Sequence, residues 1–176
     1  AELLLNATTR DGQDVTGYTS GPLGANWSYS LTGGYHRQTR KDLDDDGWID
    51  MPGFDRWTIR PRLFWEGDDG ATALVTVGAT HEDRTGGTLA GRTAPDGQPF
   101  PLTQDSRRLD AGLVAELPVE NLGKIGVRAS AMTQRHRQLF GTSAETDKQH
   151  TFFAETSLAG ESGPTNWLAG AAFQAD

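Results

Sequence analysis

The stretch from Phe54 to Trp65 alternates between apolar and polar residues almost without interruption. Because successive side chains of a β-strand point to opposite faces, this period of two predicts a strand. One face of this strand carries apolar residues with an aromatic ring near each end, and the other face carries polar residues. This arrangement is typical of a strand that faces lipid on one side and a polar lumen on the other. The apolar set is Trp57, Ile59, Pro61, Leu63 and Trp65, and the polar set is Arg56, Thr58, Arg60 and Arg62.

The same alternation recurs along the chain and predicts nine strands. Clusters of Gly, Pro, Asp and Asn mark the turns between them. Two long polar loops are expected, at 41–53 and 85–104, and the second is rich enough in Gly and Pro to be irregular throughout. We expect the strands at about 2–9, 14–20, 27–40, 54–65, 71–82, 108–117, 124–136, 151–158 and from 165 onwards.

Loop lengths distinguish the two ends of this predicted sheet. The turns after the second, fourth, sixth and eighth strands are short, the loops after the third and fifth are long, and the loop after the seventh is intermediate. Outer-membrane barrels have short periplasmic turns and longer extracellular loops in this way. Trp27, Trp65 and Trp167 lie beside short turns and are expected to form part of one aromatic girdle. The pattern therefore predicts an all-β fold, an antiparallel up-and-down transmembrane β-barrel segment.

Composition narrows the classes of protein that fit. The 176 residues suit one domain, and their net charge of -8 argues against a nucleic-acid partner. The absence of cysteine excludes disulfides, thiolate metal sites and cysteine nucleophiles. No apolar run approaches the roughly 18 residues of a transmembrane helix, and the start does not resemble a signal peptide. Since strands in hydrocarbon must pair on both sides, we expect the nine strands to belong to a larger closed barrel.

Four motifs occur in order along the chain: Asp46-Gly-Trp-Ile-Asp-Met-Pro52, Arg60-Pro-Arg-Leu-Phe-Trp65, Glu82-Asp-Arg-Thr-Gly-Gly-Thr88 and Pro95-Asp-Gly-Gln-Pro-Phe-Pro101. Their order and loop spacing, over essentially the whole chain, resemble the barrel domain of TonB-dependent outer-membrane receptors, the siderophore and cobalamin transporter family. The resemblance implies that residues 1–176 supply about nine strands of a barrel of about 22 strands. The family's plug domain and TonB box have no counterpart in this stretch.

The resemblance also implies a function, that of a non-enzymatic active transporter in the bacterial outer membrane. It would take up a scarce nutrient such as a ferric siderophore, with energy from the TonB–ExbB–ExbD complex acting through the plug. Its other partners would be outer-membrane lipid and lipopolysaccharide, and its ligand a metal chelate. Alternatives are a small closed outer-membrane barrel with an adhesive or structural role, a soluble all-β binding module, and an outer-membrane acyl hydrolase or transferase. For the last, the chain has serines and histidines but no Gly-x-Ser-x-Gly elbow.

A possible calcium site lies in the first long loop. Asp42, Asp44 and Asp46 followed by Gly47 match the first half of a calcium-binding loop, and oxygen-rich loops suit a hard cation. The twelfth position is Gly53 where a bidentate Glu belongs, so Asp50 or Asp55 would have to complete the ligand set. The alternative is a solvated acidic loop whose Asp and Gly residues satisfy turn preferences.

The polar face of the predicted strands supplies the other candidates. Its charges could form an electrostatic path for an anionic ligand, or a network of ion pairs in the barrel wall, which we favour; they are Arg56, Arg60, Arg62, Arg108, Asp110, Glu116 and Arg128. His36 and His136 are expected near the long-loop end and facing the lumen, and with Arg60 they are the candidate ligand-binding residues. Ordinary wall positions are the alternative for both histidines.

Overall fold

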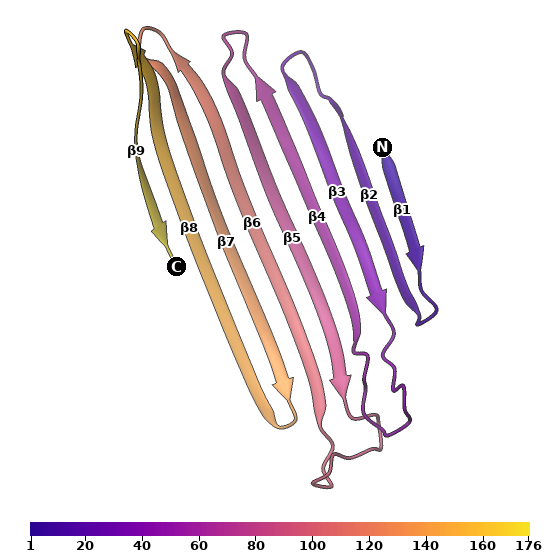
Figure 1. Ribbon diagram of the computed structural model, residues 1–176. Helices are drawn as coiled ribbons and strands as arrows, with labels where there is room; N and C mark the ends of the chain where they lie inside the picture. Colours follow the sequence, from indigo (N-terminus) through magenta and orange to yellow (C-terminus); the bar gives the residue numbers. More distant parts are fainter.

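A computed structural model describes all 176 residues as one antiparallel sheet of nine strands (Figure 1). Each strand pairs with its neighbours in sequence, so the sheet is up-and-down with the order β1 to β9, and β1 and β9 are each paired on one side only. No helix long and apolar enough to cross a membrane is present. The strands are β1 (Glu2–Ala7), β2 (Gly12–Pro22), β3 (Trp27–Gln38), β4 (Gly53–Glu66), β5 (Thr72–Gly87), β6 (Pro101–Val119), β7 (Gly123–Phe140), β8 (Ser143–Ser162) and β9 (Thr165–Ala175).

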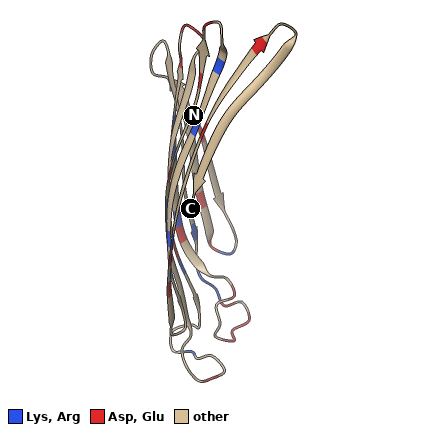
Figure 2. Cartoon of the chain, turned by 90° about the vertical axis from the view of Figure 1, so that its left-hand side faces the viewer, with Lys and Arg blue, Asp and Glu red and all other residues tan.

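The sheet is a single layer, with nothing packed on either face. Seen edge-on, the strands form one bowed sheet without a second layer (Figure 2). Only 11 of the 176 residues are buried, and the buried hydrophobic residues are Ile49 and Ala71. Because a folded domain in water normally buries its apolar face against a second layer, this chain has no hydrophobic core of its own.

Burial along the strands is the reverse of that in a soluble β-protein. In β4 the polar side chains Arg56, Thr58 and Arg60 are partly buried, whereas Trp57 and Ile59 between them are 45% and 43% exposed. The polar residues crowd together on one face and the apolar residues stand free on the other. The two faces therefore follow the predicted assignment, and the apolar rows do not form a dry interior.

The strand register aligns these apolar positions into continuous rows across the sheet. Trp27 pairs with Trp65, and their rings lie 6.3 Å apart at the short-turn end. One row near the middle of the apolar face crosses seven strands through successive partners: Tyr29, Leu63, Val75, Leu113, Ala129, Ala154 and Phe173. On β6 the apolar positions run from Leu109 to Leu117, a rise of about 27 Å at roughly 3.4 Å per residue. If the strands are tilted by about 40° from the barrel axis, this length corresponds to an apolar band about as tall as that of a membrane barrel.

The connections confirm the separation of loop lengths in part: all four at one end are short, but at the other end two of the four, 8–11 and 141–142, are short as well. At one end the turns are 23–26, 67–71, 120–122 and 163–164, all short, and the two long loops, 39–52 and 88–100, lie together at the other end (Figure 1). Two expectations were wrong. The second long loop is shorter than 85–104, because β5 continues to Gly87 and β6 begins at Pro101. The connection after the seventh strand is not intermediate but a two-residue turn at 141–142.

The strands β6, β7 and β8 are much longer than expected, at 19, 18 and 20 residues. A strand of about 9 to 11 residues is enough to cross a bilayer. Their additional residues extend toward the long-loop end, beyond the apolar rows, where both faces carry polar side chains. The sheet therefore has an apolar band near the short turns and a polar extension at the opposite end.

Candidate functional site

The polar face is held by ion pairs that cross between strands. Arg60 of β4 donates two hydrogen bonds to Asp110 of β6, at 2.7 and 2.9 Å, although β5 lies between them. The bridge passes over Gly78 of β5, where a Cβ atom would stand 2.3 Å from Arg60 Nη2. Arg108 approaches the same carboxylate, with Nε 3.4 Å from Asp110 Oδ1. Arg60 therefore belongs to a cross-strand ion-pair network on the polar face.

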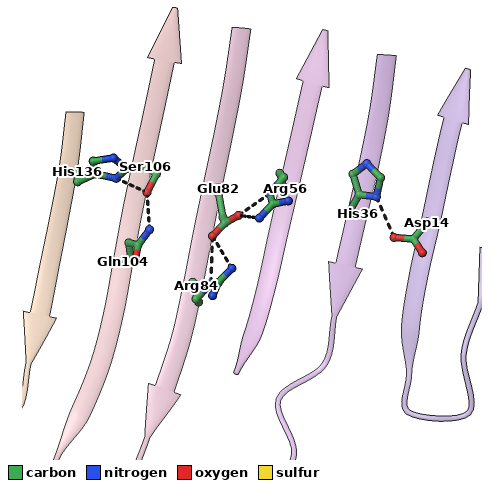
Figure 3. A network of polar contacts seen from close by, with 8 residues as sticks. All are labelled: Asp14, His36, Arg56, Glu82, Arg84, Gln104, Ser106 and His136. Atoms are coloured by element: carbon green, nitrogen blue, oxygen red, sulfur yellow. Dashed lines mark hydrogen bonds and ion pairs between the residues drawn. The ribbon is translucent and has the colours of Figure 1, made fainter. Parts of the chain in front are cut away.

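Further polar contacts lie closer to the long-loop end of the same face (Figure 3). Glu82, of which 6% is exposed, accepts hydrogen bonds from Arg56 and Arg84 on its two carboxylate oxygens. His36 Nδ1 lies 2.9 Å from Asp14 Oδ1. These contacts support the interpretation of the polar face as an ion-pair network.

His136 belongs to a chain of four polar side chains on β6 and β7. Gln104 Nε2 donates to Ser106 Oγ at 2.8 Å, Ser106 Oγ lies 2.8 Å from His136 Nδ1, and the Gln134 amide contacts His136 Nε2. Serine hydrolases orient the imidazole with a carboxylate on the nitrogen opposite the serine. Here an amide occupies that position, so the arrangement differs from that of a catalytic triad.

A polar hollow of about 410 Å³ lies between the Glu82 ion pairs and the side chains hydrogen-bonded to His136. None of the residues that line it is hydrophobic. His136 and Arg56 line it, whereas His36 and Arg60 do not. The structure therefore does not gather His36, His136 and Arg60 into one site. The hollow offers hydroxyl, amide and guanidinium groups, which suit a polar ligand with hydrogen-bond acceptors.

Sequence reasoning missed the partners in these contacts. Glu82, Ser106 and Gln134 were not candidates, because the register between strands decides which side chains meet.

The sequence also gave no sign of a group on the apolar face just beyond the apolar rows. His81 Nε2 lies 3.0 Å from Asp105 Oδ2 and 3.3 Å from Asp83 Oδ2. Their ligand atoms lie within 4.8 Å of one another. An alternating strand pattern gives no signal for such cross-strand groups.

The acidic loop brings together three of its four candidate ligands. Carboxylate oxygens of Asp42, Asp44 and Asp50 all lie within 4.8 Å of one another. The carboxylate of Asp46 instead accepts a hydrogen bond from the backbone N–H of Trp48 at 2.7 Å. Of the two residues considered for completing the set, Asp50 joins the group. Asp55 does not, since it lies on β4 and accepts a hydrogen bond from the Tyr35 hydroxyl.

The backbone of this loop is folded around the same carboxylates. The N–H of Gly47, at φ 93°, donates to Asp42 Oδ2 at 2.8 Å, and the N–H of Leu43 donates to Asp50 Oδ2 at 2.7 Å. Asp42 Oδ1 is enclosed and has no hydrogen-bond partner. A donor set of carboxylate oxygens fits calcium, which prefers oxygen ligands. We therefore retain Asp42, Asp44 and Asp50 as a candidate calcium site.

The acidic loop is fixed to the second long loop. Ile49, only 3% exposed, donates its N–H to the carbonyl of Gly87 at 2.8 Å, and the N–H of Leu89 donates to the carbonyl of Gly47. The ring of Trp48 lies 5.9 Å from that of Phe100. Any ligand of the carboxylates would therefore influence the order of both long loops.

The charges of the loop repel one another. The backbone N–H of Asp46 stabilises the charged form of Asp44, but partial desolvation and the charges of Asp46, Asp50 and Asp42 outweigh it. The pKa of Asp44 consequently lies above its ordinary value of 3.8. A bound cation would relieve this repulsion.

Comparison of the chain with models of protein families, with curated proteins and with solved structures finds no match.

We expect Asp42→Asn to weaken calcium binding by about tenfold or more, because it removes one charge from a small set of ligands. Terbium luminescence sensitised by Trp48 would measure the affinity, with calcium as the competitor. Asp45→Asn is the matched control: Asp45 lies in the same loop outside the carboxylate group, and asparagine tolerates its φ of 61°. Equal affinities for the two variants would show that the loop is only a solvated acidic turn.

The affinity for calcium should also fall on acidification, beginning at a higher pH than for an ordinary aspartate. Calcium needs the deprotonated carboxylate, and the raised pKa of Asp44 lets protons compete earlier as the pH is lowered. Binding is therefore complete above this pKa and is lost as the pH falls through it. Titrations at a series of pH values, with Asp44→Asn beside the unsubstituted protein, would measure this. The substitution should remove this part of the pH dependence, and an unchanged profile would contradict the assignment.

Proposed function

We propose that this chain is part of the wall of an outer-membrane β-barrel transporter of the TonB-dependent type. The observation that carries the proposal is the reversed burial of a single-layer sheet, in which apolar rows stand exposed and polar side chains are crowded together. In water such a surface would destabilise the folded chain, because each Å² of apolar area that stays exposed loses about 25 cal/mol of stabilisation that burial would give. Lipid on the apolar face and a polar lumen on the other would account for both faces.

Further features support a larger barrel. The first and last strands are paired on one side only, and the bilayer offers no hydrogen bonds to an unpaired strand edge. Additional strands would complete the pairing and close the wall. The short turns at one end would face the periplasm and the two long loops the cell exterior. The assignment to the TonB-dependent type, with a scarce nutrient such as a ferric siderophore as ligand, rests on the four sequence motifs.

The placement of the two faces can be tested with single cysteines, because the 176 residues contain none. Spin labels at 109, 111, 113 and 115 in the full-length protein in lipid should be accessible to dissolved oxygen and protected from a water-soluble nickel chelate. Labels at 110, 112, 114 and 116 should show the opposite preference. Val114 is the decisive position, because it is apolar but lies on the polar face. A label there shows whether accessibility follows the face of the sheet or the polarity of the replaced residue. Uniform accessibility, or a monomer that remains folded in buffer without detergent, would instead indicate a soluble module.

Transport is tested separately in cells. Deletion of the gene should abolish growth on a scarce iron or cobalamin source, and uptake by the intact strain should stop when the proton gradient is collapsed or TonB is deleted. Asp45→Asn offers a neutral comparison for expression level. Uptake that continues without TonB would overturn the transporter type while leaving the barrel wall intact.

A further inference from the structure

Three aspartates lie directly opposite one another on neighbouring strands, on the apolar face just beyond the apolar rows. Asp55 of β4 is the partner of Asp83 of β5, and Asp83 is the partner of Asp105 of β6. Like charges directly opposite on neighbouring strands destabilise a sheet. Asp55 is partly neutralised, because Arg37 Nε lies 3.7 Å from its carboxylate and the Tyr35 hydroxyl donates to it. Asp83 and Asp105 depend on other partners.

A single imidazole nitrogen lies between these two carboxylates. His81 Nε2 is 3.0 Å from Asp105 Oδ2 and 3.3 Å from Asp83 Oδ2. The nitrogen carries at most one hydrogen, so it can make a good hydrogen bond to only one of the two oxygens. Asp83 forms no other ion pair, and Asp105 has Arg107, whose Nη2 stands 3.3 Å from the same Oδ2. A divalent cation in place of the hydrogen would bind the nitrogen and both oxygens at once.

The distances within this group suit a transition metal. Zinc binds imidazole nitrogen and carboxylate oxygen at about 2.0–2.2 Å, so two ligands of a tetrahedral ion stand about 3.3–3.6 Å apart. The separation between His81 Nε2 and Asp83 Oδ2 already has this value, and that between His81 Nε2 and Asp105 Oδ2 is slightly shorter. The ligand atoms of all three residues lie within 4.8 Å of one another. The group can therefore close around an ion by small movements of its side chains.

The surroundings hold the imidazole in place and leave the group accessible. The Trp57 ring meets that of His81 edge to face, with 6.0 Å between the centroids, and this contact limits rotation of the imidazole. His81 and Asp105 are partly buried, whereas most of the Asp83 side chain is exposed. Arg107 is largely exposed as well, so it can leave Asp105 Oδ2 when a cation arrives. An ion could therefore reach the group from solvent, and water could fill a fourth position.

We propose that His81, Asp83 and Asp105 form a zinc site that links β5 to β6. One imidazole with two carboxylates matches zinc better than calcium or magnesium, which prefer oxygen ligands alone. Three protein ligands with a water molecule in the fourth position are a common ligand set for zinc. The inference goes beyond the proposed function and does not rest on it, because the site depends only on the register of two strands.

The position of the site has a consequence for the second long loop. β5 ends at Gly87 and β6 begins at Pro101, and these two residues are partners four positions beyond Asp83 and Asp105. Zinc would therefore join the two strands at the base of the loop 88–100. We expect bound zinc to slow hydrogen exchange of the backbone amides at 83–87 and 102–105, because it opposes local separation of the two strands.

Zinc affinity of the full-length protein in detergent tests the proposal. Competition with a fluorescent zinc chelator would measure it, with calcium in excess to occupy the acidic loop. We expect His81→Gln and Asp83→Asn each to lower the affinity about tenfold or more, because loss of an outer-shell partner alone typically costs about 10–100-fold. Cobalt is a second probe: the unsubstituted protein should show the intense visible absorption of a four-coordinate ion, and the two variants should not.

The matched control is His150→Gln, which removes a histidine from the same face of β8, outside the carboxylate group. It should leave both the zinc affinity and the slowed exchange at 83–87 and 102–105 unchanged. Equal affinities of His81→Gln and His150→Gln, or exchange that zinc does not slow, would overturn the site. The spin-label pattern keeps the two proposals apart. Uniform accessibility with zinc retained would reject only the proposed function, whereas alternating accessibility without zinc binding would reject only this inference.

Discussion

Replacing Leu113 with arginine is expected to lower the free energy of unfolding of the full-length protein in lipid by roughly 2–4 kcal/mol. Leu113 lies in the row that joins Val75, Ala129 and Ala154, at the middle of the apolar band. A charge at that depth must be removed from water or drawn toward a distant interface by its side chain. Both are costly at the midplane of a bilayer, and few other single changes in this wall should cost as much.

The neighbouring residue provides the control for this measurement. Val114→Arg introduces the same side chain one position along β6, on the polar face, and the two residues have similar exposure, 36% for Leu113 and 42% for Val114. Urea unfolding in lipid vesicles, followed by tryptophan fluorescence, would give both values. We expect Val114→Arg to cost less than about 1 kcal/mol. Equal costs would show that lipid does not cover the face of Leu113.

Replacing Gly78 with alanine is expected to destabilise the wall by about 1–2 kcal/mol, the scale of a hydrogen bond between charged groups. The new methyl group would occupy the path of the bridge between Arg60 and Asp110, because its carbon would stand 2.6 Å from Arg60 Cζ and 2.8 Å from Asp110 Oδ2. The guanidinium can move aside, so the strand should keep its register while the bidentate contact is lost. Since Arg60 is 36% exposed, the loss stays well below that of a buried pair.

Gly112→Ala is the matched control for this prediction. It lies on the same face of the adjacent strand, where the nearest atom to a Cβ is Thr76 Cγ2 at 3.3 Å. Combining Gly78→Ala with Asp110→Asn should add little to the cost of Asp110→Asn alone, because both disrupt the same contact. Additive losses in urea unfolding would indicate that Gly78 is needed for backbone reasons instead.

The sequence predicted the two faces of the sheet well and its strand ends poorly. Within the apolar band, the two faces of the sheet differ in polarity, so Leu63, Val75 and Leu113 could be placed on the apolar face from the alternation. Beyond the band both faces are polar, and residues 137–150 carry no alternation of hydrophobicity to mark a strand. The polar extension of β7 and β8 was for this reason mistaken for a loop.

The candidate sites differ in the same way: those built from neighbouring residues could be predicted, and those built across strands could not. The acidic loop is local, so its spacing pointed to neighbouring carboxylates, Asp42, Asp44 and Asp46. The structure groups the first two with Asp50, which the sequence offered only as one of two residues that could complete the set. The bridge from Arg60 to Asp110 joins residues fifty positions apart on strands that are not neighbours. It depends on the register of three strands and on a missing side chain at Gly78. Such a contact cannot be predicted without coordinates.

The near absence of buried residues has a consequence for how this protein reaches its destination. As the proposed barrel wall, a sheet with almost no interior gains little by folding before lipid covers it, and its exposed leucines would favour aggregation in transit. In the proposed outer-membrane barrel, the nascent polypeptide would therefore have to cross the periplasm unfolded, escorted by a holdase chaperone. Folding and membrane insertion would then be a single event, with the lipid supplying the apolar environment that other proteins build for themselves.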